Sequence, residues 1–221
     1  MANYGAVTLH EYRKKIAGTY EFISTAYHEA GHVIYGLLHF MRINSVSVFE
    51  NRKSKRIDGF THYDDYFHSN IKDPRLIANI IRNEICISYA GLSAEKYFFK
   101  TISGSDRFPL FLREGSSDDT LSAASLIKKF NLAPPGKKRH LLKQKLIKET
   151  SIELQLHWEA VVIVSQELFQ KKKLYYNDIK QLLLNKSSNK KFWKKQFKQI
   201  DYIFNNASLL DEKELKSIMF N

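Results

Sequence analysis

The feature that most constrains this chain is a His-Glu-x-x-His pattern at residues 28–32, within the segment AYHEAGHVIYG of residues 26–36. Apolar residues recur around it at three- and four-residue steps, which predicts an α-helix with one buried face. Residues four apart lie on the same face of a helix, so His28 and His32 can direct their imidazole nitrogens at one metal ion. Glu29 projects beside them, within reach of a water molecule on that metal.

Two imidazoles and an adjacent carboxylate are the groups that zinc peptidases use, the imidazoles as ligands and the carboxylate as general base. We therefore expect Zn²⁺ as the cofactor, His28 and His32 as metal ligands and Glu29 as the catalytic residue, with no organic cofactor. A catalytic zinc also needs a third protein ligand and keeps one position for water. The acidic candidates for that ligand are Glu95, Asp118 and Asp119.

The composition is that of a globular protein that folds without a membrane. Hydrophobic residues make up 43% of the chain, which is enough for a core. No apolar run approaches the roughly 20 residues of a transmembrane helix, and the first 15 residues lack the apolar centre of a secretory signal. The single cysteine, Cys86, has no partner for an intrachain disulfide. We therefore expect a cytoplasmic location and no transmembrane span.

Most of the remaining pattern is helical, with one pair of short strands. Alternation over residues 43–49, followed by a charged turn and residues 59–63, predicts a β-hairpin. Asp73 and Pro74 begin a helix with a good N-cap and a proline at the first helical position, and Gly91 is expected to interrupt it. Further helices are expected near residue 117 and over residues 137–150, 151–172 and 190–205. The predicted fold class is therefore mainly α, a helical zinc-peptidase domain with a small β-hairpin beside the metal site.

Four segments in this order resemble the peptidase domain of the FtsH-type AAA zinc metalloprotease family, and the likeness covers residues 20–185. Residues 26–32 are similar to the zinc helix of that family, and residues 46–48 with 59–61 to its strand pair. Residues 90–95 resemble its Gly-Gly-Arg-x-Ala-Glu segment and residues 115–119 its Gly-Ala-Ser-x-Asp segment. The resemblance implies a zinc-dependent metalloendopeptidase that hydrolyses peptide bonds.

The resemblance also separates the three acidic candidates. Asp119 falls on the aspartate that is the third zinc ligand of the family. Asp118 matches the variable position beside it and is expected to serve the helix N-terminus, where acidic side chains are favoured. Glu95 then becomes the carboxylate that holds a ligand histidine in place through a hydrogen bond, or an alternative ligand.

The chain departs from the family in ways that shape the expected function. It contains no Gly-x-x-x-x-Gly-Lys-Ser/Thr loop and no membrane anchor, and Leu92 stands where the family has arginine. We therefore expect an enzyme that is ATP-independent by itself and cuts flexible protein segments, or receives them from an ATPase or another protein in trans. The expected organisation is an N-terminal segment 1–19, a peptidase-like domain 20–185 and a basic helical appendage 186–221.

Two other functions stay open on the sequence. A catalytically idle, zinc-stabilised protein-binding module would keep the same ligands without turnover. The net charge of +12 and the lysines of the C-terminal segment point instead to a nucleic-acid-associated protein. Charge is the only support for that reading, and a solvated helix face is the simpler explanation of the lysine clusters. Nucleic acid is therefore the weakest of the expected partners, behind a protein or peptide substrate.

Overall fold

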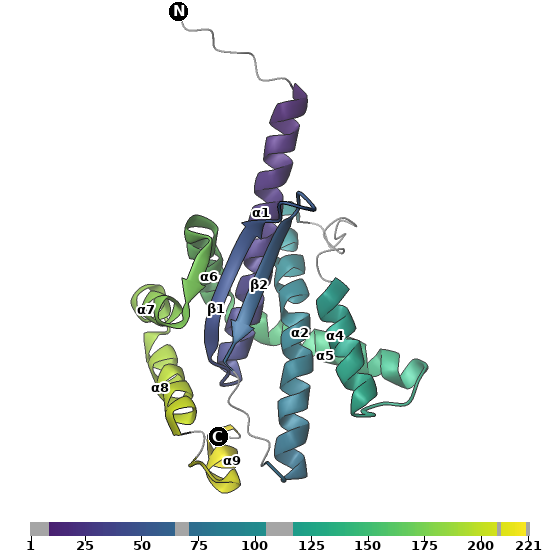
Figure 1. Cartoon of the computed structure of the whole chain (residues 1–221), viewed down its shortest axis with the longest axis vertical. Coiled ribbons are helices and arrows are strands. Elements are labelled where there is room, and N and C mark those ends of the chain that lie inside the picture. The colour runs from purple at the N-terminus through teal and green to yellow at the C-terminus, as the bar shows by residue number, and fades with distance from the viewer. Residues whose placement is uncertain (1–8, 65–70, 105–116, 207–208, 220–221) are drawn as a thin grey trace, which may run out of the picture.

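The structure, a computed structural model, describes residues 9–64, 71–104, 117–206 and 209–219. The fold is mainly helical with a small antiparallel sheet, which confirms the predicted class (Figure 1). The helices are α1 (Leu9–Leu38), α2 (Pro74–Ser103), α4 (Ser117–Lys129), α5 (Lys137–Leu156), α6 (Trp158–Lys171), α7 (Tyr176–Lys186), α8 (Lys190–Asn206) and α9 (Glu212–Met219). The strands are β1 (Ile43–Glu50), β2 (Ile57–Tyr63) and β3 (Lys173–Tyr175). Within the described residues, no helix combines the length and the apolar character needed to cross a bilayer.

Helices α1 and α2 form the centre of the molecule and pack closely because small residues meet at their contact. A Cβ on Gly31 of α1 would lie 2.6 Å from the Cβ of Ala94 and 2.7 Å from the carbonyl oxygen of Ala90. The predicted start of α2 is confirmed, since the Asp73 side chain accepts hydrogen bonds from the first backbone N–H groups. The predicted interruption at Gly91 is wrong, because α2 continues through it to Ser103.

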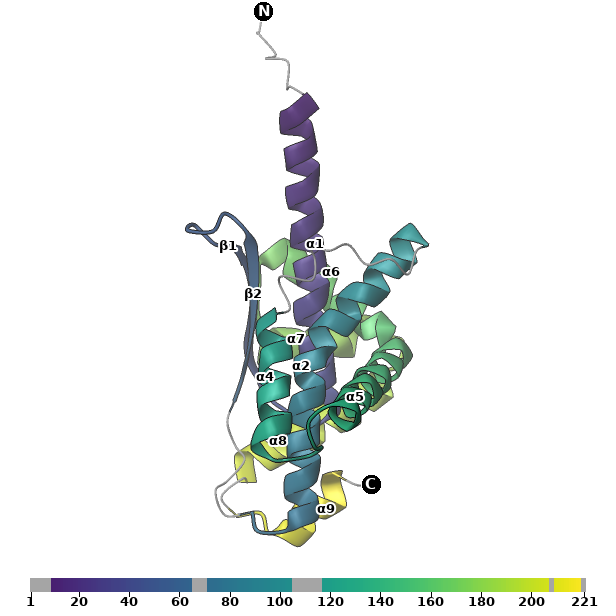
Figure 2. The ribbon, with the colours of Figure 1, turned by 90° about the vertical axis from the view of Figure 1, so that its right-hand side faces the viewer.

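The sheet has the order β2-β1-β3 and lies against α1. The predicted hairpin is confirmed, with Val46 opposite Thr61 and Val48 opposite Gly59. The third strand was not predicted, because the three residues of β3 are too few to show a period. The valines of β1 are buried against the helices, whereas in Figure 2 the helices that pack on the sheet lie to one side of it. No described helix packs on the other face of the sheet, which we call its open face.

The C-terminal helix α8 belongs to the same core as α1 and α2. Its apolar stripe, Trp193, Phe197 and Ile200, is buried in the main hydrophobic cluster. The Gln196 side chain donates hydrogen bonds to the carbonyl oxygens of Leu37 (2.7 Å) and Leu38 (3.1 Å). These two carbonyl groups lie at the end of α1, where the helix itself supplies no donor. The hydrophobic core therefore continues past residue 186, where the C-terminal appendage was expected to begin.

Candidate metal centre

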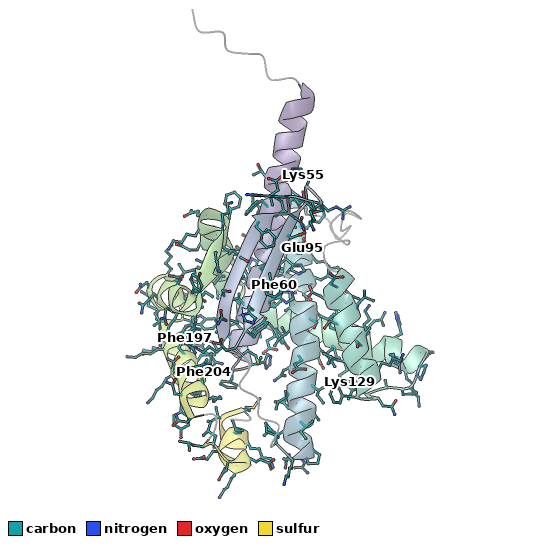
Figure 3. The ribbon with its side chains drawn as sticks, in the orientation of Figure 1. Lys55, Phe60, Glu95, Lys129, Phe197 and Phe204 are labelled. Atoms are coloured by element: carbon teal, nitrogen blue, oxygen red, sulfur yellow. The ribbon has the colours of Figure 1, made fainter. Side chains whose placement is uncertain are left out.

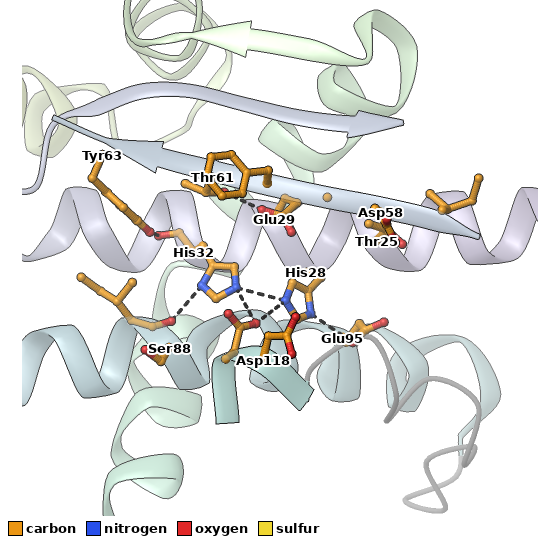
Figure 4. Close-up of a pocket in the computed structure, with 15 residues that line it drawn as sticks. Thr25, His28, Glu29, His32, Asp58, Thr61, Tyr63, Ser88, Glu95 and Asp118 are labelled. Atoms are coloured by element: carbon orange, nitrogen blue, oxygen red, sulfur yellow. Dashed lines mark hydrogen bonds and ion pairs between the residues drawn. The ribbon is translucent and has the colours of Figure 1, made fainter. Parts of the chain in front are cut away.

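Three side-chain atoms converge between α1, α2 and the first turn of α4. The Nε2 atoms of His28 and His32 lie 3.0 Å apart, and Oδ2 of Asp119 lies 2.9 Å from the first and 3.2 Å from the second. Figure 4 shows the two imidazoles directed at this point. In a tetrahedral zinc site with bonds of about 2.0–2.1 Å, neighbouring ligand atoms lie about 3.3 Å apart. The triangle is therefore close to the size of one face of such a site.

The far side of each imidazole is held by an acceptor, which fixes its tautomer. Nδ1 of His32 lies 2.8 Å from the carbonyl oxygen of Ile87, and Nδ1 of His28 lies 3.2 Å from Oε2 of Glu95. Ser24 donates a further hydrogen bond of 2.7 Å to Oε1 of Glu95. Because both Nδ1 atoms donate, both Nε2 atoms present lone pairs to the same space.

The electrostatics of this space favour a positive charge. Burial alone would lower the pKa of His28, but hydrogen bonds to Asp119 and Glu95 raise it well above its ordinary value. Burial would likewise raise the pKa of Asp119, yet the two histidines hold it well below its usual range. Two imidazole lone pairs and a carboxylate that face one another need a proton or a metal cation between them.

Gly91 leaves room for that cation. A Cβ at this position would lie 2.4 Å from Nε2 of His28 and 2.5 Å from Nε2 of His32. A side chain at residue 91 would therefore fill the space that the three atoms face, and glycine leaves this space free for an ion. The sequence interpretation of Gly91 as a helix break missed this role, although its place in the family-like segment 90–95 was a usable signal.

Glu29 is buried beside the triangle but is held toward the sheet. Its Oε2 accepts a hydrogen bond of 2.6 Å from the Thr61 hydroxyl, and a Cβ on Gly59 would lie 2.4 Å from its Oε1. Potential ligand atoms of His28, Glu29 and His32 all lie within 4.8 Å of one another, so this group could hold a metal ion. The contact with Thr61 gives Glu29 a different partner from the two histidines, which suits a base better than a ligand.

The structure brings most of the expected site residues together around one cleft of about 430 Å³. Residues 57–61 of β2 form one wall, and within the described chain β2 pairs only with β1, so its other edge is open. Asp118 lies exposed at the rim, next to the more buried Asp119. Residues 115 and 116 of the last family-like segment lie outside the described residues. Sequence reasoning missed Thr61 and Gly59 as site residues, although strand alternation places them on one face of β2.

The cleft is acidic in a basic protein. Among the described residues that line it, none is lysine or arginine, whereas the whole chain has a net charge of +12. A cation of charge +2 would be offset by Asp119 and Glu29, which leaves three further carboxylates. The acidic lining residues are Glu29, Asp58, Glu95, Asp118 and Asp119.

Comparison with protein-family models and with curated proteins gives no match to this chain. The fold and the site define a mainly helical domain with a buried histidine and carboxylate group that could hold a metal ion. The case for an activity therefore rests on the chemistry of these residues and on the resemblance of the sequence segments.

Proposed function

We propose that this protein is a zinc-dependent metalloendopeptidase, with His28, His32 and Asp119 as ligands and Glu29 as general base. The observation that carries the proposal is the convergence of three acceptor atoms on the space left by Gly91, beside a separately held carboxylate. Two imidazoles and one carboxylate form a ligand set that suits zinc and leaves a fourth position open. The resemblance to the FtsH-type peptidase domain supports the same ligands.

The chain supplies the groups that peptide hydrolysis needs. When bound, the cation provides a Lewis acid that polarises the peptide carbonyl and acidifies a water molecule. Glu29 accepts the proton of that water on Oε1, while Thr61 holds Oε2 in place. The same carboxyl then passes the proton to the nitrogen of the leaving amine. Glu95 and the Ile87 carbonyl keep the two imidazoles oriented throughout.

The open edge of β2 is the proposed handle for substrate. An extended peptide can add to a free strand edge through backbone hydrogen bonds, whatever its side chains. Gly59 and Thr61 both face Glu29 from β2, so a peptide paired beside them lies over the metal centre. This mode of binding selects flexible segments of a protein, or segments that a partner such as an ATPase has unfolded.

The hydrogen bond between Thr61 and Glu29 favours an enzyme over a zinc-stabilised binding module. A structural zinc site is closed by four protein ligands. Here the described residues bring three ligand atoms to the triangle. The fourth candidate ligand, the carboxylate of Glu29, is held by Thr61 instead. A module that only bound zinc would gain nothing from holding Glu29 away from the metal.

The charge of the cleft predicts which peptides are cut fastest. Internally quenched peptides of one length, with lysine, serine or glutamate on both sides of the scissile bond, are compared with the full chain. The lysine peptide is expected to have a kcat/KM at least about tenfold above that of the glutamate peptide, because like charges brought together in a cleft are costly. Asp58→Asn, which removes one charge outside the ligand triangle, should narrow the difference. Cleavage of no peptide would contradict the proposed function, and equal cleavage of all three would contradict only the role of charge.

A further inference from the structure

The open face of the sheet carries aromatic side chains on both outer strands. On β2, Phe60 is 60% exposed and its ring stacks beside that of exposed His62, with ring centroids 6.2 Å apart. On β3, Tyr175 is 53% exposed. Figure 3 shows Phe60 on the near side of the sheet, away from the helices. These rings are large apolar surfaces that the fold does not bury.

Between these aromatic residues the central strand presents Ser45 and Ser47, and Phe49, which is 46% exposed, follows them on the same face. Ser47 is paired with Phe60 on one side and Lys173 on the other, and Ser45 with His62 and Tyr175. Because neighbouring strands are about 4.8 Å apart, the two outer strands stand about 10 Å from each other. The face is therefore a shallow trough, which we call the serine trough, with a serine floor and aromatic walls.

Positive charge surrounds one end and one wall of the serine trough. The turn between β1 and β2 reads NRKSKR at residues 51–56, and its cationic side chains are exposed. Lys173 is also exposed, with Nζ 4.8 Å from the centre of the Tyr175 ring. The acidic residues near the trough are Glu50, Asp58 and Asp178, the last of which accepts a hydrogen bond from the backbone N–H of Tyr175, so the cations of the turn and Lys173 outnumber them. Figure 3 places Lys55 at the tip of the hairpin, beyond Phe60.

We propose that the serine trough binds single-stranded nucleic acid. Bases stack on exposed aromatic rings, and phosphates are attracted by lysine and arginine, which is the combination found here. Stacking on side chains requires unpaired bases, so a single strand fits and a duplex does not. The floor hydroxyls of Ser45 and Ser47 face the same trough as potential hydrogen-bonding groups.

Two observations favour nucleic acid over other anionic partners. The turn of the hairpin, residues 51–56, contains no apolar residue, whereas a membrane-binding loop places its apolar side chains at the tip. Helix α8 also presents exposed lysines, but its large aromatic residues Trp193 and Phe197 are buried. On α8 the lysines are accompanied by one exposed ring, that of Tyr202, whereas the sheet combines its cations with the exposed rings of Phe60, His62 and Tyr175.

The serine trough and the metal centre lie on opposite faces of β2, and Phe60 also borders the cleft. Gly59 and Thr61 of β2 face Glu29, whereas Phe60 and His62 alternate with them and face the opposite side. The proposal therefore does not depend on peptidase activity.

The test is a binding titration of the full chain with a fluorescein-labelled oligonucleotide of mixed sequence, followed by fluorescence anisotropy. Single-stranded RNA, single-stranded DNA and the DNA duplex are compared. Tyr175→Ala and Phe60→Ala, which change no charge, are each expected to weaken single-strand binding by about tenfold, within the range measured for base stacking. The double variant Lys194→Gln, Lys195→Gln removes two charges from α8 and is expected to weaken it less than about threefold.

The outcomes separate the possible partners. The proposal is supported if the two aromatic variants lose single-strand binding while the lysine variant keeps it, and if the wild type binds the duplex more weakly than a single strand. It is supported whether RNA or DNA binds more tightly. Equal binding of the aromatic variants and the wild type would overturn it, as would a duplex bound as tightly as a single strand. Binding to vesicles with one third phosphatidylserine that Phe60→Ala abolishes, without oligonucleotide binding, would overturn it in favour of a membrane. Both aromatic residues are more than half exposed, so the variants should fold, which circular dichroism can verify.

Discussion

Replacement of Glu29 by glutamine is expected to leave the metal bound and to lower kcat for peptide hydrolysis by about 10²–10⁴-fold, the usual contribution of a general base. Glutamine has nearly the same shape, and its side-chain oxygen can still accept the hydrogen bond from Thr61 that holds Glu29 at 2.6 Å. The amide cannot take a proton from water, so chemistry is lost while the fold and the His28 and His32 positions are kept. The measurement is steady-state hydrolysis of a quenched peptide together with metal content by mass spectrometry.

The matched control is Glu21→Gln, the same chemical change on the same helix two turns earlier. Glu21 accepts a hydrogen bond from the backbone N–H of Ile57 and does not line the cleft. This variant should retain activity within about twofold, since the glutamine side-chain oxygen can still accept the hydrogen bond from Ile57. Undiminished hydrolysis by purified Glu29→Gln would remove Glu29 from the mechanism.

A single methyl group on Gly91 is expected to weaken metal binding by at least about 100-fold, beyond the 10–100-fold loss typical when a residue that supports a ligand is removed. The added Cβ would lie within 2.5 Å of both Nε2 atoms, so the imidazoles must turn away from Asp119. The helix itself should tolerate the change, because alanine is a better helix former than glycine. Metal affinity is measured by competition with a chromophoric chelator.

Two glycines of α1 serve as controls for Gly91→Ala. Nothing lies within 4 Å of a Cβ on Gly18, so Gly18→Ala should bind metal normally and be more stable by roughly 1 kcal/mol. A Cβ on Gly31 meets α2 away from the ligands, so Gly31→Ala should lower the melting temperature of the metal-free protein. One metal ion bound per chain by Gly91→Ala, with wild-type affinity, would show that the cation lies elsewhere.

The local part of the site could be predicted from the sequence, and the part that depends on tertiary contacts could not. His28 and His32 share one helix face because of a four-residue spacing, which any helix imposes. The residues alone left three acidic candidates for the third ligand. The family resemblance selected Asp119, and the structure brings its carboxylate to both imidazoles across 91 and 87 residues of chain.

Gly91 and Thr61 illustrate what local reasoning misses. Glycine is unfavourable inside a helix, which is why an interruption was expected, but the contact with α1 requires a residue without a side chain at that point. In the sequence, Thr61 has the pattern of an ordinary strand residue. Its role depends on the tertiary contact between β2 and Glu29, which the sequence does not show. The sequence predicted the helix over residues 190–205, but not that its apolar side would complete the core beside the end of α1.

The most direct test of the account is a zinc titration of metal-stripped protein in which peptide hydrolysis is followed, for the wild type, Asp119→Asn and Asp118→Asn. The wild type and Asp118→Asn are expected to be inactive after stripping and to recover fully with one equivalent of Zn²⁺. Asp119→Asn should need far more zinc, because only two of its ligands remain in the triangle with His28 and His32. Hydrolysis that survives complete stripping, or an Asp119→Asn titration that overlays the wild type, would contradict the metal centre described above.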